Sequence, residues 1–155
     1  MMMRMMRMMR KFEKCQGATE STRFPQRSTG KAAGYDFFSP VPITIGPKQW
    51  GLIKTNIKAQ MEDDDVLLIF PRSSLGIKKH LMLANTTGVI DADYYNNPDN
   101  EGNIILALYN YGDREQHISP GDKVAQGVFV KYGVTADDVT VSKRERVGGV
   151  GSTGK

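Results

Sequence analysis

The spacing of short apolar segments constrains the fold of this chain more than any other feature. From residue 32 onward these segments recur at intervals of about ten residues, separated by Gly, Asn and Pro, which is typical of all-β sandwiches and barrels. Val41, Ile43 and Ile45 alternate with Pro42 and Thr44, as expected of a half-exposed strand. The pattern predicts strands over 41–45, 52–57, 66–70, 80–84, 87–91, 103–110, 115–118, 123–132 and 138–142.

Only one segment has helical character. Residues 73–79 (SSLGIKK) predict a short helix, for which a serine could act as the N-cap. No other segment has apolar residues at the 3.6-residue period of an amphipathic helix, which disfavours the α/β nucleotide-binding folds. We therefore expect an all-β fold with one short helix and a glycine-rich C-terminal tail.

Length and composition limit the remaining possibilities. A chain of 155 residues predicts one domain, and its 39% hydrophobic and 25% charged residues exclude wholesale disorder. No apolar run approaches the roughly 18 residues of a transmembrane helix. A single cysteine, Cys15, excludes a disulfide scaffold and fits a reducing compartment, so we expect a cytoplasmic location.

The positive charge of the chain is concentrated at its N-terminal end. The net charge is +4, but residues 1–31 carry +6 and the remaining residues −2. We therefore interpret 1–31 as a basic low-complexity tail and linker, in which 16–31 is a linker or a loosely held first strand, and expect neither nucleic acid nor membrane as a partner. The opening MMMRMMRMMRK leaves two readings open, a transit-like or membrane-surface helix, or an extension without a packed role.

Small, charged and hydroxylic residues cluster in five segments. Each segment alone is compatible with an ordinary turn, but together they supply donors suited to phosphate oxygens. These donors are Arg72, Ser73, Ser74, Gln126, Arg146, Ser152 and Thr153. Asp36 and Asp91 lie in two of the segments and could serve a hard cation or polarise water. The combination indicates a triphosphate with magnesium as the substrate. The segments are AAGYDFFS (32–39), PRSSLG (71–76), NTTGVIDADY (85–94), GDKVAQGVF (121–129) and RVGGVGSTG (146–154).

These five segments, in this order, resemble the five motifs of the trimeric dUTP diphosphatase (dUTPase) family. The resemblance implies a homotrimer of distorted jelly-roll-like β-barrels with active sites at the subunit interfaces. It implies hydrolysis of dUTP to dUMP and diphosphate with Mg2+, which limits uracil in DNA and supplies dUMP for thymidylate synthesis. Residues 32–145 would then form the barrel and residues 146–155 a C-terminal lid.

The resemblance also implies roles for individual residues in the third motif. Asp91 would be the general base that activates the attacking water, and the ring of Tyr94 would pack against C2′ of the deoxyribose. Tyr95 is adjacent to Tyr94 and could be the inward-facing tyrosine instead. The uracil-reading and substrate-side positions would be Asn85, Gly88, Val89, Ile90 and Ile105.

The remaining roles concern the triphosphate. Arg72, Ser73, Ser74 and Gln126 would hold the phosphates, and Asp36 would contact magnesium through water. The C-terminal segment would close over the γ-phosphate as it orders, excluding water. Its contributing residues would be Arg146, Gly151, Ser152 and Thr153.

Two departures from the family pattern stand out. Residues 95–101 are inserted before Gly102, which predicts a longer hairpin tip and puts the roles of Gly102 and Ile105 in question. Val150 stands where the family has an aromatic residue that stacks on uracil. Trp50 or Phe129 could replace that aromatic.

Three other functions compete with this interpretation. A dCTP deaminase would need a glutamate where Ala107 stands in Leu106–Asn110. A nucleotide-binding regulatory module would use the inserted tip and the basic tail. Nucleic-acid binding is favoured only by the pI of about 9.2. Cys15, His80 and His117 lack the spacing of a metal or nucleophile set.

Overall fold

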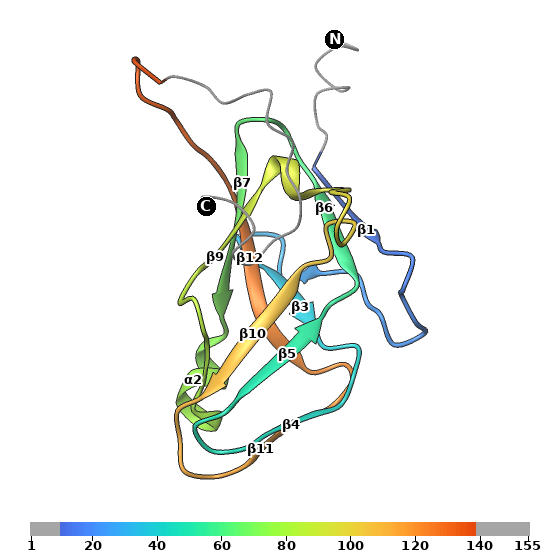
Figure 1. Ribbon diagram of the computed structural model, residues 1–155, viewed down its shortest axis with the longest axis vertical. Coiled ribbons are helices and arrows are strands. Elements are labelled where there is room, and N and C mark those ends of the chain that lie inside the picture. The colour runs from blue at the N-terminus through green and yellow to red at the C-terminus, as the bar shows by residue number, and fades with distance from the viewer. Residues whose placement is uncertain (1–9, 139–155) are drawn as a thin grey trace.

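Antiparallel strands dominate the computed structural model, which describes residues 10–138 (Figure 1). Those residues contain twelve strands, one α-helix and one 3-10 helix. In chain order they are β1 (Lys11–Lys14), β2 (Gln26–Arg27), β3 (Tyr35–Phe38), β4 (Ile43–Ile45), β5 (Trp50–Lys54), β6 (Ile57–Gln60), β7 (Asp65–Pro71), α2 (Ser73–Lys79), β8 (Leu81–Leu83), β9 (Gly88–Asp91), η1 (Ala92–Tyr94), β10 (Ile105–Asn110), β11 (Gln116–Ile118) and β12 (Lys123–Lys131).

Two sheets form the body of the fold. The larger has the strand order β2-β3-β12-β7-β9 and the smaller β5-β10-β8, while β1 pairs with β6 and β11 with β4. Strand β10 shows how the sheets meet, because Leu106, Leu108 and Asn110 are buried and alternate with half-exposed residues. Between the sheets lies one core that includes Phe37, Leu67 and Ile69. This jelly-roll-like β architecture confirms the predicted all-β class, although hydrogen bonds among the described residues do not close a barrel.

The predicted strands and helix match the structure closely from residue 41 to residue 131. One exception is the strand expected over 52–57, which the structure divides into β5 and β6. Asn56 adopts a left-handed φ of 60°, and the buried Thr55 donates its hydroxyl to the carbonyl of Ile104 at 2.7 Å. The chain therefore turns where apolar periodicity alone suggests continuation. Residues 139–142 of the last predicted strand lie outside the described residues.

The helix begins in a different way from the one that its sequence suggests. Helix α2 spans the predicted residues, but Arg72 occupies its N-cap without a side-chain capping bond, so the predicted serine cap is wrong. Ser73 and Ser74 instead lie exposed in the first turn. Within residues 10–138, no helix is long and apolar enough to cross a membrane.

The segment expected to be tail and linker contributes two strands to the fold. Strand β1 pairs in register with β6, and Phe12 packs edge-on against Phe37 and Tyr35. Arg10 donates two hydrogen bonds to the fully buried Asp65, at 2.7 and 3.0 Å. Residues 10–27 are therefore an integral part of the domain, and only residues 1–9 of this segment lie outside the description.

Candidate active site

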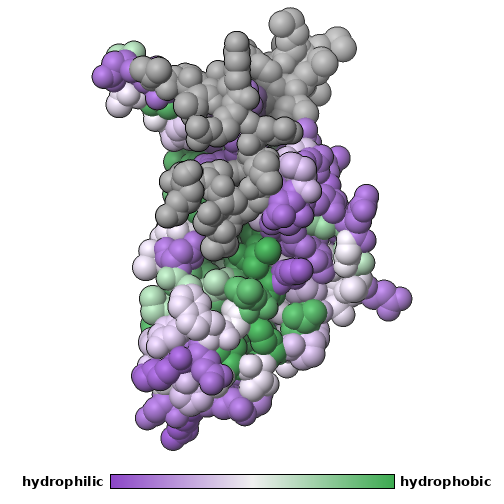
Figure 2. Space-filling view, viewed as in Figure 1, coloured by the Kyte–Doolittle hydropathy of each residue, from purple (hydrophilic) through white to green (hydrophobic). Residues whose placement is uncertain are grey.

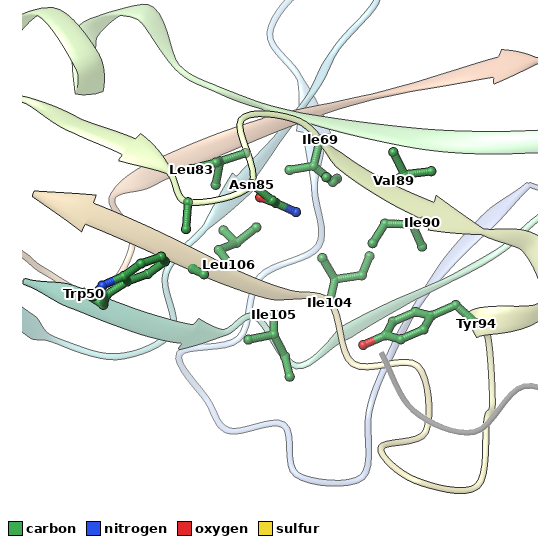
Figure 3. A pocket seen from close by; sticks show the side chains of 13 residues that line it. Trp50, Ile69, Leu83, Asn85, Val89, Ile90, Tyr94, Ile104, Ile105 and Leu106 are labelled. Atoms are coloured by element: carbon green, nitrogen blue, oxygen red, sulfur yellow. The ribbon is translucent and has the colours of Figure 1, made fainter. Parts of the chain in front are cut away.

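A cavity of about 400 Å³ opens between the β8–β9 connection and strand β10 (Figure 3). The six residues expected to contact base and sugar all line it: Asn85, Gly88, Val89, Ile90, Tyr94 and Ile105. Figure 3 shows Tyr94 and Trp50 at opposite ends of the cavity, with Asn85 between them. The walls are mostly apolar with a few polar groups, as is usual for a small-molecule site.

Close packing of two strands explains the glycine in the cavity wall. Gly88 pairs with Ile69 of β7, and a Cβ at Gly88 would come within 3.1 Å of the Ile69 Cβ. Only glycine lets β9 approach β7 this closely without displacing Ile69. Strand β9 is also an edge strand of the described five-stranded sheet, so its outer backbone groups can bond a ligand.

Tyr94, not Tyr95, faces the cavity. The side chain of Tyr94 is 7% exposed, and its hydroxyl donates to the carbonyl of Asn103 at 2.6 Å. Tyr95 faces the other way, where its hydroxyl donates to Glu13 at 2.8 Å. Burial and this bond to a carboxylate raise the pKa of Tyr95. The two adjacent tyrosines therefore divide into one cavity residue and one residue that contacts β1.

Asp91 ends strand β9, directly after Ile90 of the cavity wall, and is exposed to water. Its backbone is opposite Val66, near the start of β7. Ala107, at the position where a deaminase would need glutamate, lines the same cavity with a methyl group. The only carboxylate expected to act as a base thus lies beside the cavity and not inside it.

A second cluster lies at the other end of the large sheet. Asp36 and Gln126 are directly opposite on β3 and β12, and Arg72 donates to Asp36 Oδ1 at 2.9 Å. Lys123 Nζ lies 3.4 Å from Asp36 Oδ2. A bulge between Lys123 and Ala125 lets residues 123 and 126, an odd number apart, face the same side. Arg72, Lys123 and Gln126 therefore converge around one carboxylate.

Sequence reasoning missed Lys123 as a member of this cluster. It lies inside a singled-out segment, but the bulge that turns it toward Asp36 has no signature in the residue pattern. The same strand explains Gly34, because a Cβ there would come within 2.5 Å of Gln126 Oε1. Because Gly34, just before β3, has no side chain, the Gln126 side chain can occupy this space.

The two clusters are far apart within one chain. Asp91 is paired with Val66, whereas Arg72 follows the last residue of β7, six residues further along. At roughly 3.3 Å per residue, the backbones of Asp91 and Arg72 are about 20 Å apart. The cavity residues and the Asp36 cluster therefore lie toward opposite ends of β7 in one copy of the chain.

The described residues contain no group of three His, Cys, Asp or Glu side chains that could hold a metal ion. Asp36 is 8% exposed, and both of its oxygens already face cations, Arg72 on one side and Lys123 on the other. A carboxylate held in this way suits contact with a hydrated cation better than direct ligation.

Part of the predicted site lies outside residues 10–138. Arg146, Gly151, Ser152 and Thr153, and Val150 beside them, belong to the segment that the structure does not describe. Of the two aromatics considered as replacements, Trp50 lines the cavity and is 63% exposed. Phe129 instead packs against Phe12 and Tyr35, away from the cavity.

Comparison with known proteins gives a consistent result. The sequence model of the dUTPase family matches residues 20–154. A deoxyuridine 5'-triphosphate nucleotidohydrolase of Lactococcus lactis is 46% identical over 130 residues, covering 84% of this chain and 87% of the relative. The mouse enzyme of that name is 34% identical over 140 residues, covering 88% of this chain and 82% of the relative.

Solved structures agree with these sequence matches. The crystal structure of the Streptococcus mutans dUTPase superimposes with a TM-score of 0.77 at 40% identity, covering 80% of this chain and 97% of that one. A point mutant of the dUTPase from Staphylococcus aureus phage phi11 gives a TM-score of 0.71 at 25% identity, covering 85% of this chain and 96% of that one. That structure shows the coordination of a structural Mg(II) ion.

Proposed function

The chain belongs to the dUTPase family and hydrolyses dUTP, and we propose that Asp91 activates the attacking water. In this mechanism the Asp91 carboxylate takes a proton from a water molecule while the oxygen of that water bonds to the α-phosphorus. The bond between the α-phosphorus and the bridging oxygen breaks, releasing diphosphate and leaving dUMP. The observation that carries this proposal is the shared cavity of the six predicted base and sugar residues, with Asp91 directly after Ile90 of its wall.

The position of Asp91 suits a general base. It is exposed, so water can reach the carboxylate, and the preceding strand residues would hold the nucleoside beside it. A positioned base of this kind contributes about 10²–10⁴ in rate. Because Asp91 ends a strand paired to β7, its backbone is fixed by the sheet and not by a loop.

We assign recognition of the uracil base to Asn85 and to the edge of β9. Uracil presents an N–H donor between two carbonyl acceptors, and the outer edge of a strand that ends the described sheet, together with an amide side chain, can match this pattern. Cytosine has a different donor and acceptor arrangement on the same edge, which would leave polar groups of the site unpaired. Discrimination of this kind reaches about 10⁴–10⁵.

We assign exclusion of ribose to Tyr94. Its ring lies in the cavity wall and its hydroxyl is bonded at the far end, so the ring cannot easily withdraw. A 2′-hydroxyl would have to occupy the space of the ring. UTP would therefore bind less well than dUTP.

Phosphate binding, in this proposal, falls to a second copy of the chain. Arg72, Ser73, Ser74, Lys123 and Gln126 are all near the end of β7 that lies away from Asp91, with the Arg72 backbone about 20 Å from that of Asp91. A complete site therefore needs Asp91 of one copy and Arg72 of another. The family resemblance favours a homotrimer for this arrangement, with Arg146, Gly151, Ser152 and Thr153 closing over the γ-phosphate.

We further propose that Mg2+ is the cofactor, held chiefly by phosphate oxygens and water, with Asp36 as an outer contact. The fit rests on Asp36, whose two oxygens are oriented by Arg72 and Lys123. When bound, the ion would neutralise charge on the triphosphate. The buried, single Cys15 is compatible with a reducing, cytoplasmic setting, which we also propose.

A nucleotide-selectivity assay tests the proposed function directly. With Mg2+ present, the purified protein should release diphosphate from dUTP far faster than from dCTP, dTTP or UTP. Similar turnover of all four nucleotides would contradict the assigned roles of the cavity.

A further inference from the structure

The inserted residues 95–101 form a compact loop that contacts the hydroxyl of Tyr94. Asn100 Nδ2 donates to Tyr94 Oη at 2.9 Å, and Tyr94 Oη in turn donates to the carbonyl of Asn103 at 2.6 Å. These two partners of the hydroxyl come from the insertion and from the residues that directly follow it. The insertion is therefore in contact with a residue of the cavity wall.

A network of amide side chains holds Asn100 in this orientation. Asn100 Oδ1 accepts from the backbone N–H of Gly102 at 3.0 Å and from Asn97 Nδ2 at 2.8 Å. Asn97 Nδ2 also donates to the carbonyl of Tyr94 at 2.7 Å. With Oδ1 occupied by donors, the amide of Asn100 must direct its nitrogen toward Tyr94.

The insertion is also anchored to the N-terminal part of the fold. Lys58 Nζ, on a residue that is 9% exposed, donates to Asn96 Oδ1 at 2.6 Å and to Glu101 Oε2 at 2.7 Å. The backbone N–H of Gln16 donates to the same Glu101 carboxylate. Gly102 closes the loop with a φ of +94°, and a Cβ there would lie 2.9 Å from the Tyr94 carbonyl. The loop is thus fixed at both ends.

We propose that Asn100 is a positioning residue that locks Tyr94 in place, so that the insertion sets the preference for 2′-deoxyribose over ribose. The inference rests on the proposed function, in which Tyr94 excludes the 2′-hydroxyl. A tyrosine ring can exclude a hydroxyl only if it does not rotate or shift away. Two hydrogen bonds at its far end oppose such movement, one of them from Asn100.

The test replaces the Asn100 amide nitrogen and retains the hydrogen bonds that Asn100 Oδ1 accepts within the loop. In Asn100→Asp the carboxylate still accepts from Gly102 and Asn97 but cannot donate to Tyr94 Oη. We expect the ratio of kcat/KM for dUTP to that for UTP to fall about fivefold, the size expected for one lost hydrogen bond. The change should come from a lower KM for UTP, with kcat for dUTP little altered.

Two further variants extend the test, and the second of them reports general damage to the loop. Asn100→Ser, whose hydroxyl is too short to reach Tyr94 Oη, should lower the ratio in the same direction. Asn96→Asp makes the same chemical change in the same loop and keeps the acceptor for Lys58, so its ratio should equal that of the wild type. An unchanged ratio in both Asn100 variants would overturn the proposal.

A double-mutant cycle shows whether Asn100 acts through the hydroxyl. Tyr94→Phe keeps the ring but removes the partner of Asn100, so adding Asn100→Asp should cause no further loss of selectivity. An equal additional loss in that background would refute the positioning role. If Tyr94→Ala leaves the ratio unchanged, the proposed role of Tyr94 in excluding ribose is wrong. If Tyr94→Ala lowers the ratio but Asn100→Asp does not, only the positioning role of Asn100 is wrong.

Discussion

Asp91 is exposed like several other aspartates, but it directly follows Ile90 of the cavity wall. Asp91→Asn keeps the shape of the side chain but removes its ability to take a proton. We expect a loss of at least about 10²-fold in kcat with the dissociation constant for dUTP almost unchanged. Steady-state kinetics and equilibrium binding measure the two quantities.

The matched control is Asp99→Asn, in the exposed part of the inserted loop. It makes the same substitution outside the site, so its kcat should equal that of the wild type. Full activity of Asp91→Asn would show that another group activates the water.

Lys123 allows a second test at the residue scale. Its ammonium lies 3.4 Å from Asp36, on the same side of the sheet as Arg72 and Gln126. Lys123→Ala should raise KM for dUTP about threefold and leave kcat within about twofold, since a half-exposed charge contributes modestly. The control is Lys54→Ala, which changes an exposed lysine on β5. An unchanged KM for dUTP in Lys123→Ala would show that Lys123 does not help to bind the phosphates.

The sequence predicted six residues that the structure brings together around one cavity, but not the hydrogen-bond partners of the candidate site residues. Asn85, Asp91 and Tyr94 belong to ordered motifs that a sequence can reveal. Asn100 and Lys123 are placed by a loop network and a β-bulge, which depend on backbone geometry. The choice between Tyr94 and Tyr95 likewise needed the structure, because Glu13, the partner of Tyr95, is far away in the sequence.

Among the elements, β1 is anchored by an ion pair with a pH-dependent contribution. The hydrogen bond from Arg10 holds the pKa of the buried Asp65 at about 2, below its ordinary value. Because the folded pKa lies below the unfolded one, this stabilisation is present above about pH 4 and is lost as the pH falls toward about 2.

Arg10→Ala should therefore lower the free energy of unfolding at neutral pH by about 1–2 kcal/mol. The difference from the wild type should shrink as the pH falls from about 4 to about 2, when Asp65 becomes protonated in both proteins. Denaturant unfolding at one protein concentration measures it, with exposed Lys11→Ala as the control. A difference that stays constant over this pH range would rule out the pair as its cause.

The predictability of the elements follows their apolar patterns. Strands β7, β10 and β12 have long apolar or alternating runs and were predicted from the sequence. Strands β1 and β2 are short and carry charged residues, so their composition resembles a linker. Strand β1 is held because Phe12 and Arg10 find distant partners in the core and in Asp65, and β2 is held by its pairing with β3.

For the whole molecule, the exposed apolar surface supports association of several copies. Trp50 and Val89, which also line the cavity, are 63% and 58% exposed, and Leu52 is 64% exposed. Separately, Figure 2 shows green apolar residues gathered near the middle of one face. Contiguous apolar surface on a folded chain commonly marks an interface. Periodicity and composition alone do not indicate a divided site, because they do not reveal distance along β7; only the family resemblance implied sites at subunit interfaces.

Sharing of the site between copies is the central claim, and complementation between two inactive variants tests it most directly. Asp91→Asn lacks the base and Arg72→Ala lacks the phosphate arginine, so each alone should have little activity. After the two are unfolded, mixed in equal amounts and refolded together, about a quarter of the shared sites would combine an intact Asp91 with an intact Arg72. We predict recovery of activity toward about a quarter of the wild-type value; a mixture no more active than its separate components would contradict the account.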